Sequence, residues 1–198
     1  MGLDIKYIDG QTPIDEKEKE GLLIKTISTK EDLDEFEQLN IEEALQWVFA
    51  RKFKAEKVLT EQFIRGLHKR MYGSVWAWAG QFRTTDINIG VDKHQIPVQL
   101  KILCDDSLFW IKNTTYPPEE IAIRFKHRLV SIHCFPNGNG RHSRLMADII
   151  IEKLFGREPF SWGAANLSEA GDTRSTYMKA VKLADRHEYK PLLDFAQS

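Results

Sequence analysis

The sequence is poor in cysteine and has no long apolar run. Its two cysteines, Cys104 and Cys134, are too few for a disulfide framework in a chain of 198 residues. No apolar stretch approaches the roughly 20 residues of a membrane span, and residues 1–20 are polar and acidic rather than a secretory signal. The sequence therefore disfavours a disulfide-rich secreted scaffold and a membrane protein, and we expect a cytoplasmic location with no membrane partner.

Net charge is also nearly absent, at −1, but the charges are unevenly placed. Residues 1–43 hold 13 acidic and 5 basic residues, whereas residues 44–198 hold 16 acidic and 23 basic ones. The acidic part is either a solvated arm or a segment that docks on the basic body near Arg141 and Arg144. Because the body has no stripe of Lys and Arg with interleaved aromatic residues, we do not expect it to bind nucleic acid.

A hydrophobic content of 42% beside 29% charged residues is typical of one globular domain with its own core. We divide the chain into an acidic N-terminal segment, residues 1–40, and a body, residues 41–198. The apolar spacing predicts a mainly α fold. Its helices are expected within residues 30–53, 60–72, 98–113, 118–132, 139–156, 166–184 and 190–197.

One good strand signal interrupts this helical pattern, within residues 73–97. Ile87 and Ile89 alternate with polar residues, Gly90 opens a turn, and a second short apolar piece ends at Ile96 and Pro97. This pattern predicts a small β-hairpin. Such a hairpin is either purely structural or an edge on which an extended peptide can pair.

The stretch from 133 to 144 reads His-Cys-Phe-Pro-Asn-Gly-Asn-Gly-Arg-His-Ser-Arg. Gly138 and Gly140 lack a Cβ atom, so the backbone can turn sharply and bring its N–H groups close to an anion. A helix that starts near Asn139 or Gly140 would direct its unpaired N–H groups and its positive dipole end at the same point. This part of the stretch predicts a phosphate-binding loop.

Three charged or titratable side chains border this loop. Arg141 and Arg144 are three residues apart, so they share one face of the helix and add two permanently charged donors. His133 lies on the opposite side of the loop, where a neutral imidazole can take a proton from an attacking hydroxyl. The combination predicts transfer of a phosphate-containing group.

The stretch resembles the signature of the Fic/Doc family, His-x-Phe-x-(Asp/Glu)-Gly-Asn-Gly-Arg-x-x-Arg. Seven of its eight specified positions match: His133, Phe135, Gly138, Asn139, Gly140, Arg141 and Arg144. At the eighth, Asn137 replaces a carboxylate that holds Mg²⁺ in the family, and a neutral amide oxygen is a weaker ligand. Phe135 is expected to anchor the loop, and Cys134 to pack in the core instead of acting as a nucleophile. The acidic segment ahead of this core resembles the subgroup labelled mobile mystery protein B.

The resemblance implies a Fic-type helical bundle, with residues 41–198 as its catalytic domain, and a protein adenylyltransferase. Such an enzyme moves AMP from ATP, with Mg²⁺, to a Ser, Thr or Tyr hydroxyl of a target protein. In that role His133 is the general base, and Asn137 is a weak metal ligand. The implied nucleotide contacts are Gly138, Asn139, Gly140, Arg141, Arg144 and Tyr177. The hairpin corresponds to the family's flap, which holds an extended target segment, here with Ile87, Asn88, Ile89, Gly90, His94, Gln95 and Ile96.

Many Fic proteins carry an inhibitory glutamate that pairs with the second motif arginine, here Arg144. No strict match to the inhibitory pattern is present, and the nearest is residues 38–43, in which Glu42 is the candidate inhibitor. Glu37 is a second candidate, and a solvated helix face is the alternative for both. An antitoxin-like partner protein is another source of such a glutamate.

Two alternatives to AMP transfer remain open. The same site could transfer another phosphate-containing group, as a kinase or a transferase of a different nucleotide does, although the retained Gly-Asn-Gly argues against the phosphorylating branch. Alternatively, Asn137 could make the protein a weakly active nucleotide-binding regulator.

Overall fold

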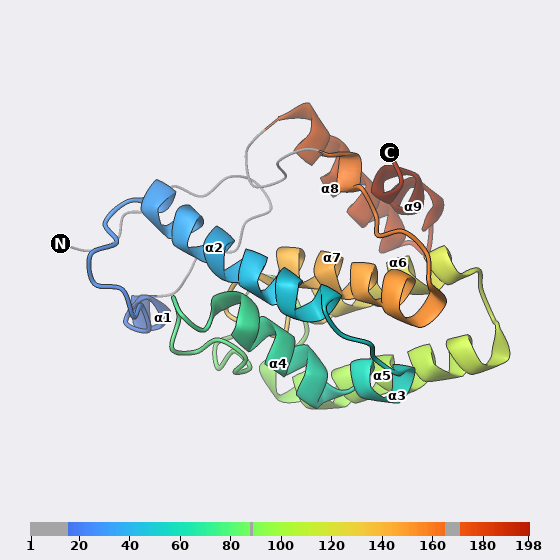
Figure 1. Ribbon diagram of the computed structural model, residues 1–198, viewed down its shortest axis with the longest axis horizontal. Helices are drawn as coiled ribbons and strands as arrows, with labels where there is room; N and C mark the ends of the chain where they lie inside the picture. Colours follow the sequence, from blue (N-terminus) through green and yellow to red (C-terminus); the bar gives the residue numbers. More distant parts are fainter. Residues whose placement is uncertain (1–15, 88, 165–170) are drawn as a thin grey trace.

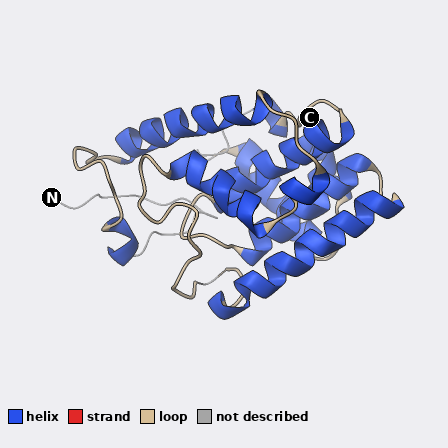
Figure 2. Cartoon of the chain, turned by 60° about the horizontal axis from the view of Figure 1, so that its bottom comes forward, coloured by secondary structure: helices blue, strands red, loops and turns tan. Residues whose placement is uncertain are grey.

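The computed structural model describes residues 16–87, 89–164 and 171–198, and this part of the chain is mainly helical (Figures 1 and 2). The mainly α prediction is therefore confirmed. No helix among the described residues is long and apolar enough to cross a membrane. The α-helices are α1 Glu16–Lys19, α2 Lys30–Phe49, α3 Ala55–Val58, α4 Glu61–Tyr72, α5 Ile96–Asn113, α6 Pro118–Ile132, α7 Asn139–Ile149, α8 Asp172–Ala184 and α9 Lys190–Ala196. Shorter turns are the 3₁₀ segments η1 Lys93–Gln95 and η3 Trp162–Ala164 and the π-helical η2 Ile150–Leu154.

The helices begin where the sequence supplies partners for their first N–H groups. The Thr29 side chain accepts a hydrogen bond from the Asp32 N–H at 3.1 Å, and the Asp32 carboxylate accepts one from the Thr29 N–H at 3.1 Å, which is a complete capping box. Thr60 caps α4 through the Phe63 N–H at 3.2 Å. Pro118, which lacks an N–H, starts α6.

Helices α6 and α7 occupy the middle of the molecule. Helix α4 packs on α7 and α5 packs on α6 from one side, while α9 packs on α6 from the other and joins α8 (Figure 1). The core between them contains fully buried large side chains, among them Phe125, Phe135 and Tyr72. The loop that joins α6 to α7 is consequently held between packed helices.

Helix α2 runs unbroken across residue 40, so the predicted division of the chain falls inside a helix. It packs on α4 and buries Leu33, Glu37, Asn40, Ile41, Ala44 and Val48. The last part of the acidic N-terminal segment is thus a packed helix and not a solvated arm, while residues 1–15 lie outside the described residues.

The predicted β-hairpin is wrong for the residues that the structure describes. Residues 82–87 and 89–92 form a loop, Lys93–Gln95 form the 3₁₀ turn η1, and Ile96 begins α5 with its side chain fully buried. Strand-like pairing in the described part of the chain is limited to a single antiparallel bridge between Leu22 and Trp76. We keep the name flap for residues 84–95, of which Asn88 lies outside the described residues.

Candidate functional site

The motif forms the turn between α6 and α7. His133 ends α6 in the left-handed conformation (φ 56°, ψ 62°), and its N–H donates to the Leu129 carbonyl at 3.3 Å. Gly138 begins α7 with φ 77°, and a Cβ atom at this position would lie 2.5 Å from the Tyr72 ring. Both the positive φ and the contact with Tyr72 therefore require glycine at 138.

The N-terminus of α7 is the predicted anion site. The first N–H bonded within the helix is that of His142, which donates to the Gly138 carbonyl at 2.9 Å. The N–H groups of residues 139–141 precede it, and they have no carbonyl of the preceding turn to bond. These donors and the helix dipole favour a phosphate at this end of α7.

The Asn139 side chain forms two hydrogen bonds within the loop, both to the Phe135 backbone. Its side-chain oxygen accepts from the Phe135 N–H at 3.0 Å, and its side-chain nitrogen donates to the Phe135 carbonyl at 2.7 Å. Only 5% of Asn139 is exposed. The side chain predicted to contact phosphate is therefore engaged within the loop, and its contribution to the anion site is to hold the backbone in place.

Arg141 is held by the second of the two candidate inhibitory residues. Its guanidinium donates to the Glu37 carboxylate, whose other oxygen accepts from Trp76 Nε1 at 2.6 Å. Burial by itself would lower the pKa of Arg141, but the charge and hydrogen bond of Glu37, together with the smaller effects of Tyr72 and Asp34, outweigh it and the pKa is raised. Glu37 is 2% exposed and pairs with the first motif arginine, whereas the resemblance implied the second, Arg144.

Glu42, the nearer match to the inhibitory pattern, does not reach the site. Its carboxylate is exposed and accepts from Gln38 Nε2 at 3.1 Å on the outer face of α2. Glu37 is instead four residues after Leu33 and four before Ile41, so it shares their buried face. The phase of the helix therefore separates the two candidates, because Glu42 lies on its exposed face and Glu37 lies beside Arg141.

Within the described residues, Arg144 contacts Tyr177 and forms no ion pair with a carboxylate. Its guanidinium lies 5.6 Å from the centre of the Tyr177 ring, and Lys126 Nζ lies 4.7 Å from the same ring. Burial would raise the pKa of Tyr177, but the two cations, Lys126 first, together lower it. The structure thus brings Tyr177 beside the motif and adds the buried Lys126, which no sequence signal indicated.

His133 is nearly buried, with 7% of its surface exposed. Burial and, to a smaller extent, the charge of Arg83 lower its pKa to about 4, against the opposing effect of a hydrogen bond to the Val130 backbone. The imidazole is therefore neutral at pH 7, which is the form that can accept a proton. Cys134 beside it is fully buried and its thiol pKa is raised to about 12, in keeping with packing and not with nucleophilic chemistry.

Asn137 lies half-buried at the rim of the loop. Its Oδ1 accepts from the Gly138 N–H at 2.5 Å, and its carbonyl contacts His68 Nε2 at 3.0 Å. Burial holds the pKa of His68 well below its usual range, so this ring is neutral and can donate to that carbonyl. Among the described residues no group of three or more His, Cys, Asp or Glu side chains could hold a metal ion. Asn137 could supply at most one neutral oxygen.

Only part of the predicted flap reaches the motif. Gly90 lies against His133, since a Cβ atom at 90 would be 2.7 Å from the His133 Cβ. Ile89 is 48% exposed, and His94 and Gln95 are exposed in η1. Ile96 is buried in α5 and is not a flap residue.

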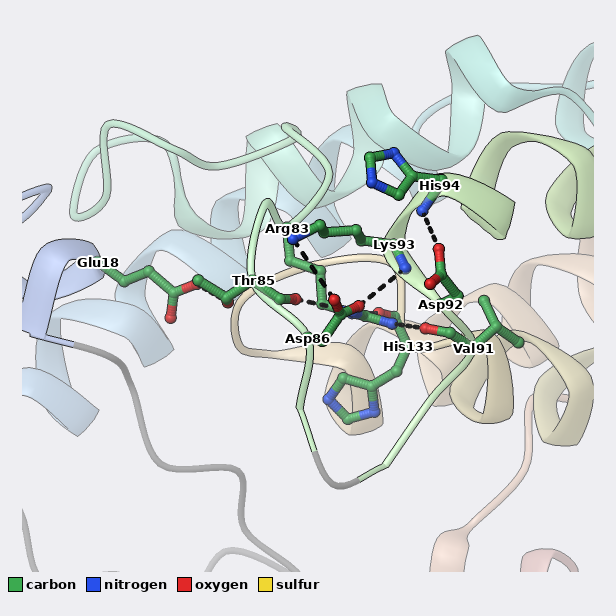
Figure 3. A network of polar contacts seen from close by, with 9 residues as sticks. All are labelled: Glu18, Arg83, Thr85, Asp86, Val91, Asp92, Lys93, His94 and His133. Carbon is green, nitrogen blue, oxygen red and sulfur yellow. Dashed lines mark hydrogen bonds and ion pairs between the residues drawn. The ribbon is translucent and has the colours of Figure 1, made fainter.

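Arg83 is a further residue of the site, and its buried side chain joins the flap to His133 (Figure 3). A lone arginine after a Gly-Gln-Phe stretch carries no signal of this role. Trp76 lies in a stretch with two further aromatic residues, Trp78 and Phe82, and nothing in its spacing reveals that its indole faces Glu37.

Comparison with known proteins gives a consistent result. The family model described as Fic/DOC family matches residues 58–151. A mosquito relative, protein adenylyltransferase Fic from Aedes aegypti, is 26% identical over 163 residues, which is 80% of this chain and 31% of the relative. The chain therefore spans about a third of the length of that relative.

Solved structures show the same fold. Fic-1 from C. elegans, residues 134–508, superposes with a TM-score of 0.69 at 24% identity, over 90% of this chain and 51% of that one. The N-terminal Fic domain of a putative cell filamentation protein from Bartonella quintana, solved with bound ADP, gives a TM-score of 0.67 at 16% identity, over 87% and 86% of the two chains. The motif, the helical fold and the matching family model identify this chain as a Fic-domain protein.

Proposed function

We propose that this Fic domain transfers AMP from ATP to a hydroxyl group of a target protein. The observation that carries the proposal is the arrangement at the α6–α7 turn. A neutral His133 lies on one side of a loop whose other side is a helix N-terminus followed by Arg141 and Arg144. The name of the Aedes aegypti relative and the ADP bound to the Bartonella quintana domain support this choice of chemistry and of nucleotide.

In the proposed reaction the target hydroxyl oxygen attacks the α-phosphorus of ATP, and the bond from that phosphorus to the bridging oxygen of pyrophosphate breaks. His133 accepts the hydroxyl proton as the new P–O bond forms. The N–H groups of residues 139–141 stabilise the charge on the phosphoryl oxygens, and Arg141 and Arg144 hold the β- and γ-phosphates. Tyr177, which contacts Arg144, is proposed to border the nucleotide.

The low pKa of His133 suits this role in one respect and limits it in another. With a pKa of about 4 the ring is unprotonated at neutral pH, but it is a weak base. A bound triphosphate places negative charge next to the imidazole and raises its pKa toward neutrality. Substrate binding itself would therefore strengthen the base.

Mg²⁺ is the metal that the family resemblance implies, and Asn137 fits it only weakly. Mg²⁺ is usually held by one or two carboxylates together with substrate phosphates, and Asn137 offers one neutral oxygen, which already accepts from Gly138 N–H. When bound, the ion would neutralise phosphate charge. The phosphates and water would supply most of its ligands.

We further propose that Glu37 inhibits the enzyme in cis. An arginine engaged by a buried carboxylate is not available to a phosphate, and the two anions cannot share Arg141 without repulsion. ATP must therefore displace Glu37 or bind with its terminal phosphates misplaced. An antitoxin-like partner is not needed for inhibition of this kind.

The target protein is proposed to present an extended segment along the flap. In the described part of the flap, the backbones of Thr84, Ile87 and Ile89 make no hydrogen bond to another described residue, and we propose that the target segment pairs with them. Pairing there would place a target hydroxyl beside Gly90, which lies against His133.

The test uses α-³²P-ATP and γ-³²P-ATP in parallel with Mg²⁺ and a cell lysate as the source of target. The variants are wild type, Glu37→Gln, His133→Ala and the double variant. AMP transfer predicts label on protein from the α position only, stronger in Glu37→Gln and lost when His133 is replaced. Label from the γ position alone would make the protein a kinase.

The second candidate function is a nucleotide-binding regulator, which Asn137 favours because it replaces the metal-binding carboxylate. It predicts no label in any variant, together with ATP binding that is measurable by titration calorimetry. Absence of both label and binding in Glu37→Gln would contradict both functions.

A further inference from the structure

Arg83 is a buried arginine that bonds to carbonyl groups at two points of the flap and at the motif. Its Nε donates to the His133 carbonyl at 2.7 Å, and its Nη1 donates to the Thr85 carbonyl at 2.8 Å (Figure 3). Its Nη2 donates to the Val91 carbonyl. All three nitrogens of one planar guanidinium are thus used, and they fix three points of backbone with respect to one another.

The charge of Arg83 is held mainly by backbone carbonyls. Its side chain is 1% exposed, and the carboxylate beside it, that of Asp86, is 3.7 Å away and 57% exposed. A buried guanidinium with so little carboxylate compensation is costly unless its hydrogen bonds are well placed. The Asp86 carboxylate also accepts from the Lys93 N–H at 3.1 Å, which closes the far part of the flap.

The carbonyl that receives Arg83 Nε belongs to the residue proposed as the base. His133 adopts left-handed φ and ψ, a conformation that a residue with a Cβ atom rarely takes without support. Two backbone bonds flank this point: the Arg83 N–H donates to Cys134 at 3.0 Å, and the Val91 N–H donates to Ile132 at 3.3 Å. The backbone direction from which the imidazole extends is therefore set by the flap.

Gly90 brings the flap backbone into direct contact with His133. Its φ is +98°, and a Cβ atom at this position would lie 2.7 Å from the His133 Cβ and 3.0 Å from Arg83 Nη2. The flap backbone thus rests directly on His133, with no side chain between them.

From this geometry we propose that Arg83 is a positioning residue for group transfer. Its guanidinium holds the flap, which presents the target hydroxyl, at a fixed distance from His133. The imidazole of His133 takes the proton of that hydroxyl. This inference rests on the proposed function of the flap and of His133. Since a displacement of about 1 Å between reacting groups can lower a rate by about 100-fold, loosening this link is costly for the reaction.

The first experiment replaces Arg83 by Lys and by Gln in the Glu37→Gln background. A lysine ammonium keeps the charge but cannot direct donors at three separate carbonyls. The expected result is a fall in kcat for transfer to protein of about 100-fold in both variants, with the Kd for ATP changed less than threefold. The matched control is Arg65→Lys, since Arg65 Nε donates to the Gly80 carbonyl at 2.9 Å and does not touch His133. Transfer by Arg83→Lys in this background within threefold of the Glu37→Gln parent would overturn the proposal.

A second variant tests the same contact if the Arg83 variants do not fold. Gly90→Ala keeps Arg83 but pushes the flap away from His133, and it is expected to lower kcat as Arg83→Lys does. Its control is Gly156→Ala, because Gly156 has a similar positive φ of +66° but open space where the Cβ would be placed. Equal activity of Gly90→Ala and Gly156→Ala would count against the role of the contact.

A readout that does not depend on transfer separates this inference from the proposed function. The NMR signal of the His133 imidazole should shift and broaden in Arg83→Lys and stay unchanged in Arg65→Lys, because the ring loses its fixed direction only in the first. If wild type transfers no AMP but this NMR result is obtained, the proposed function fails and the positioning role stands. An unchanged His133 signal in Arg83→Lys overturns the positioning role whatever the activity.

Discussion

The carboxylate of Glu37 forms an ion pair with the guanidinium of Arg141, 104 positions away in the sequence. Glu37 is nearly inaccessible to solvent, and Trp76 Nε1 holds its second oxygen at 2.6 Å. The carboxylate is thus fixed at the first arginine of the motif, where a phosphate of the nucleotide is expected. Two predictions concern this pair directly.

Replacing Glu37 by Gln should raise the affinity for ATP. The amide keeps an oxygen for Trp76 but loses the charge that competes for Arg141, so we expect the Kd to fall by about tenfold, which corresponds to about 1.4 kcal/mol. Titration calorimetry with ATP measures this. Glu42→Gln, on the exposed face of the same helix, is the control and should bind as wild type does. Equal affinity in Glu37→Gln and Glu42→Gln would show that the pair does not block the nucleotide.

Replacing Trp76 by Phe should release Glu37 in part. Phenylalanine retains much of the buried aromatic ring but has no N–H, so the carboxylate loses a donor and keeps Arg141. We expect ATP affinity to rise by about threefold, in line with roughly 0.5–1 kcal/mol for one hydrogen bond. Trp78→Phe is the matched control, because the Trp78 indole stacks on Trp76 but donates to the Glu18 carbonyl. A Trp76→Phe protein that binds ATP no better than Trp78→Phe would contradict this account.

The pH dependence of the reaction should show that His133 is neutral in the free enzyme. Its pKa is lowered to about 4, so kcat/KM is expected to stay level from pH 7 down to about pH 5 and to fall near pH 4 as the ring gains a proton. An unperturbed histidine would cause this fall near pH 6.5. The profile is best measured in the Glu37→Gln background, in which Arg141 is free. A fall centred near 6.5 would mean that His133 is not the base or is not buried in solution.

The sequence predicted the helices well because their signals are local. Thr60, Thr29 and Pro118 act within one turn of the chain, so their capping roles are visible without knowledge of the fold. The motif residues lie within one short stretch, 133–144, and the structure places them at one turn. Short-range sequence patterns were therefore sufficient to predict the helix starts and this turn.

The structure differs from the predicted hairpin and from the expected place of Glu42 for different reasons. Alternation at Ile87 and Ile89 is a strand signal only if a second strand is available, and residues 93–96 instead turn into α5. Glu42 was favoured by its spacing in a motif, although the burial of Leu33 and Ile41 places Glu37 on the inner face. Arg83 could not be found, because its three carbonyl partners come together only in the folded chain.

Restoring a carboxylate at position 137 should strengthen the metal dependence of the site. Asn137→Asp offers Mg²⁺ a charged oxygen in place of a neutral one, so we expect a lower Mg²⁺ concentration for half-maximal activity, by about tenfold. Mg²⁺ titration of AMP transfer in the Glu37→Gln background measures this. An unchanged Mg²⁺ requirement would indicate that residue 137 does not contact the ion.

Asp148, one turn after Arg144 on α7, should make stability depend on pH. Burial raises its pKa to about 7, against the hydrogen bonds that its carboxylate accepts from Trp162 Nε1 and the Phe160 N–H. A raised folded pKa means that the folded state binds a proton that the unfolded state releases near pH 3.8. The contribution of Asp148 to stability is therefore complete below pH 3.8 and is lost as the pH rises to 7, with a slope of about 1.4 kcal/mol per pH unit.

Asp148→Asn should remove this dependence, since the amide keeps an acceptor oxygen and does not ionise. The difference in unfolding free energy between the variant and wild type should grow from pH 4 to pH 7 and stay constant above it. Urea unfolding at several pH values measures the difference. A difference that is independent of pH would mean that Asp148 titrates normally.

The course of α2 determines how the inhibition could be relieved. Glu37 belongs to a helix whose inner face contributes six buried residues, Leu33 through Val48, to the core. Proteolytic loss of the residues before α2 would leave Glu37 in place. Loss of α2 itself would remove Glu37 but would expose the apolar surface of α4 and destabilise the enzyme. Relief of inhibition is therefore expected while α2 stays packed on α4. A nucleotide or a partner would displace the Glu37 carboxylate from Arg141 without removing the helix.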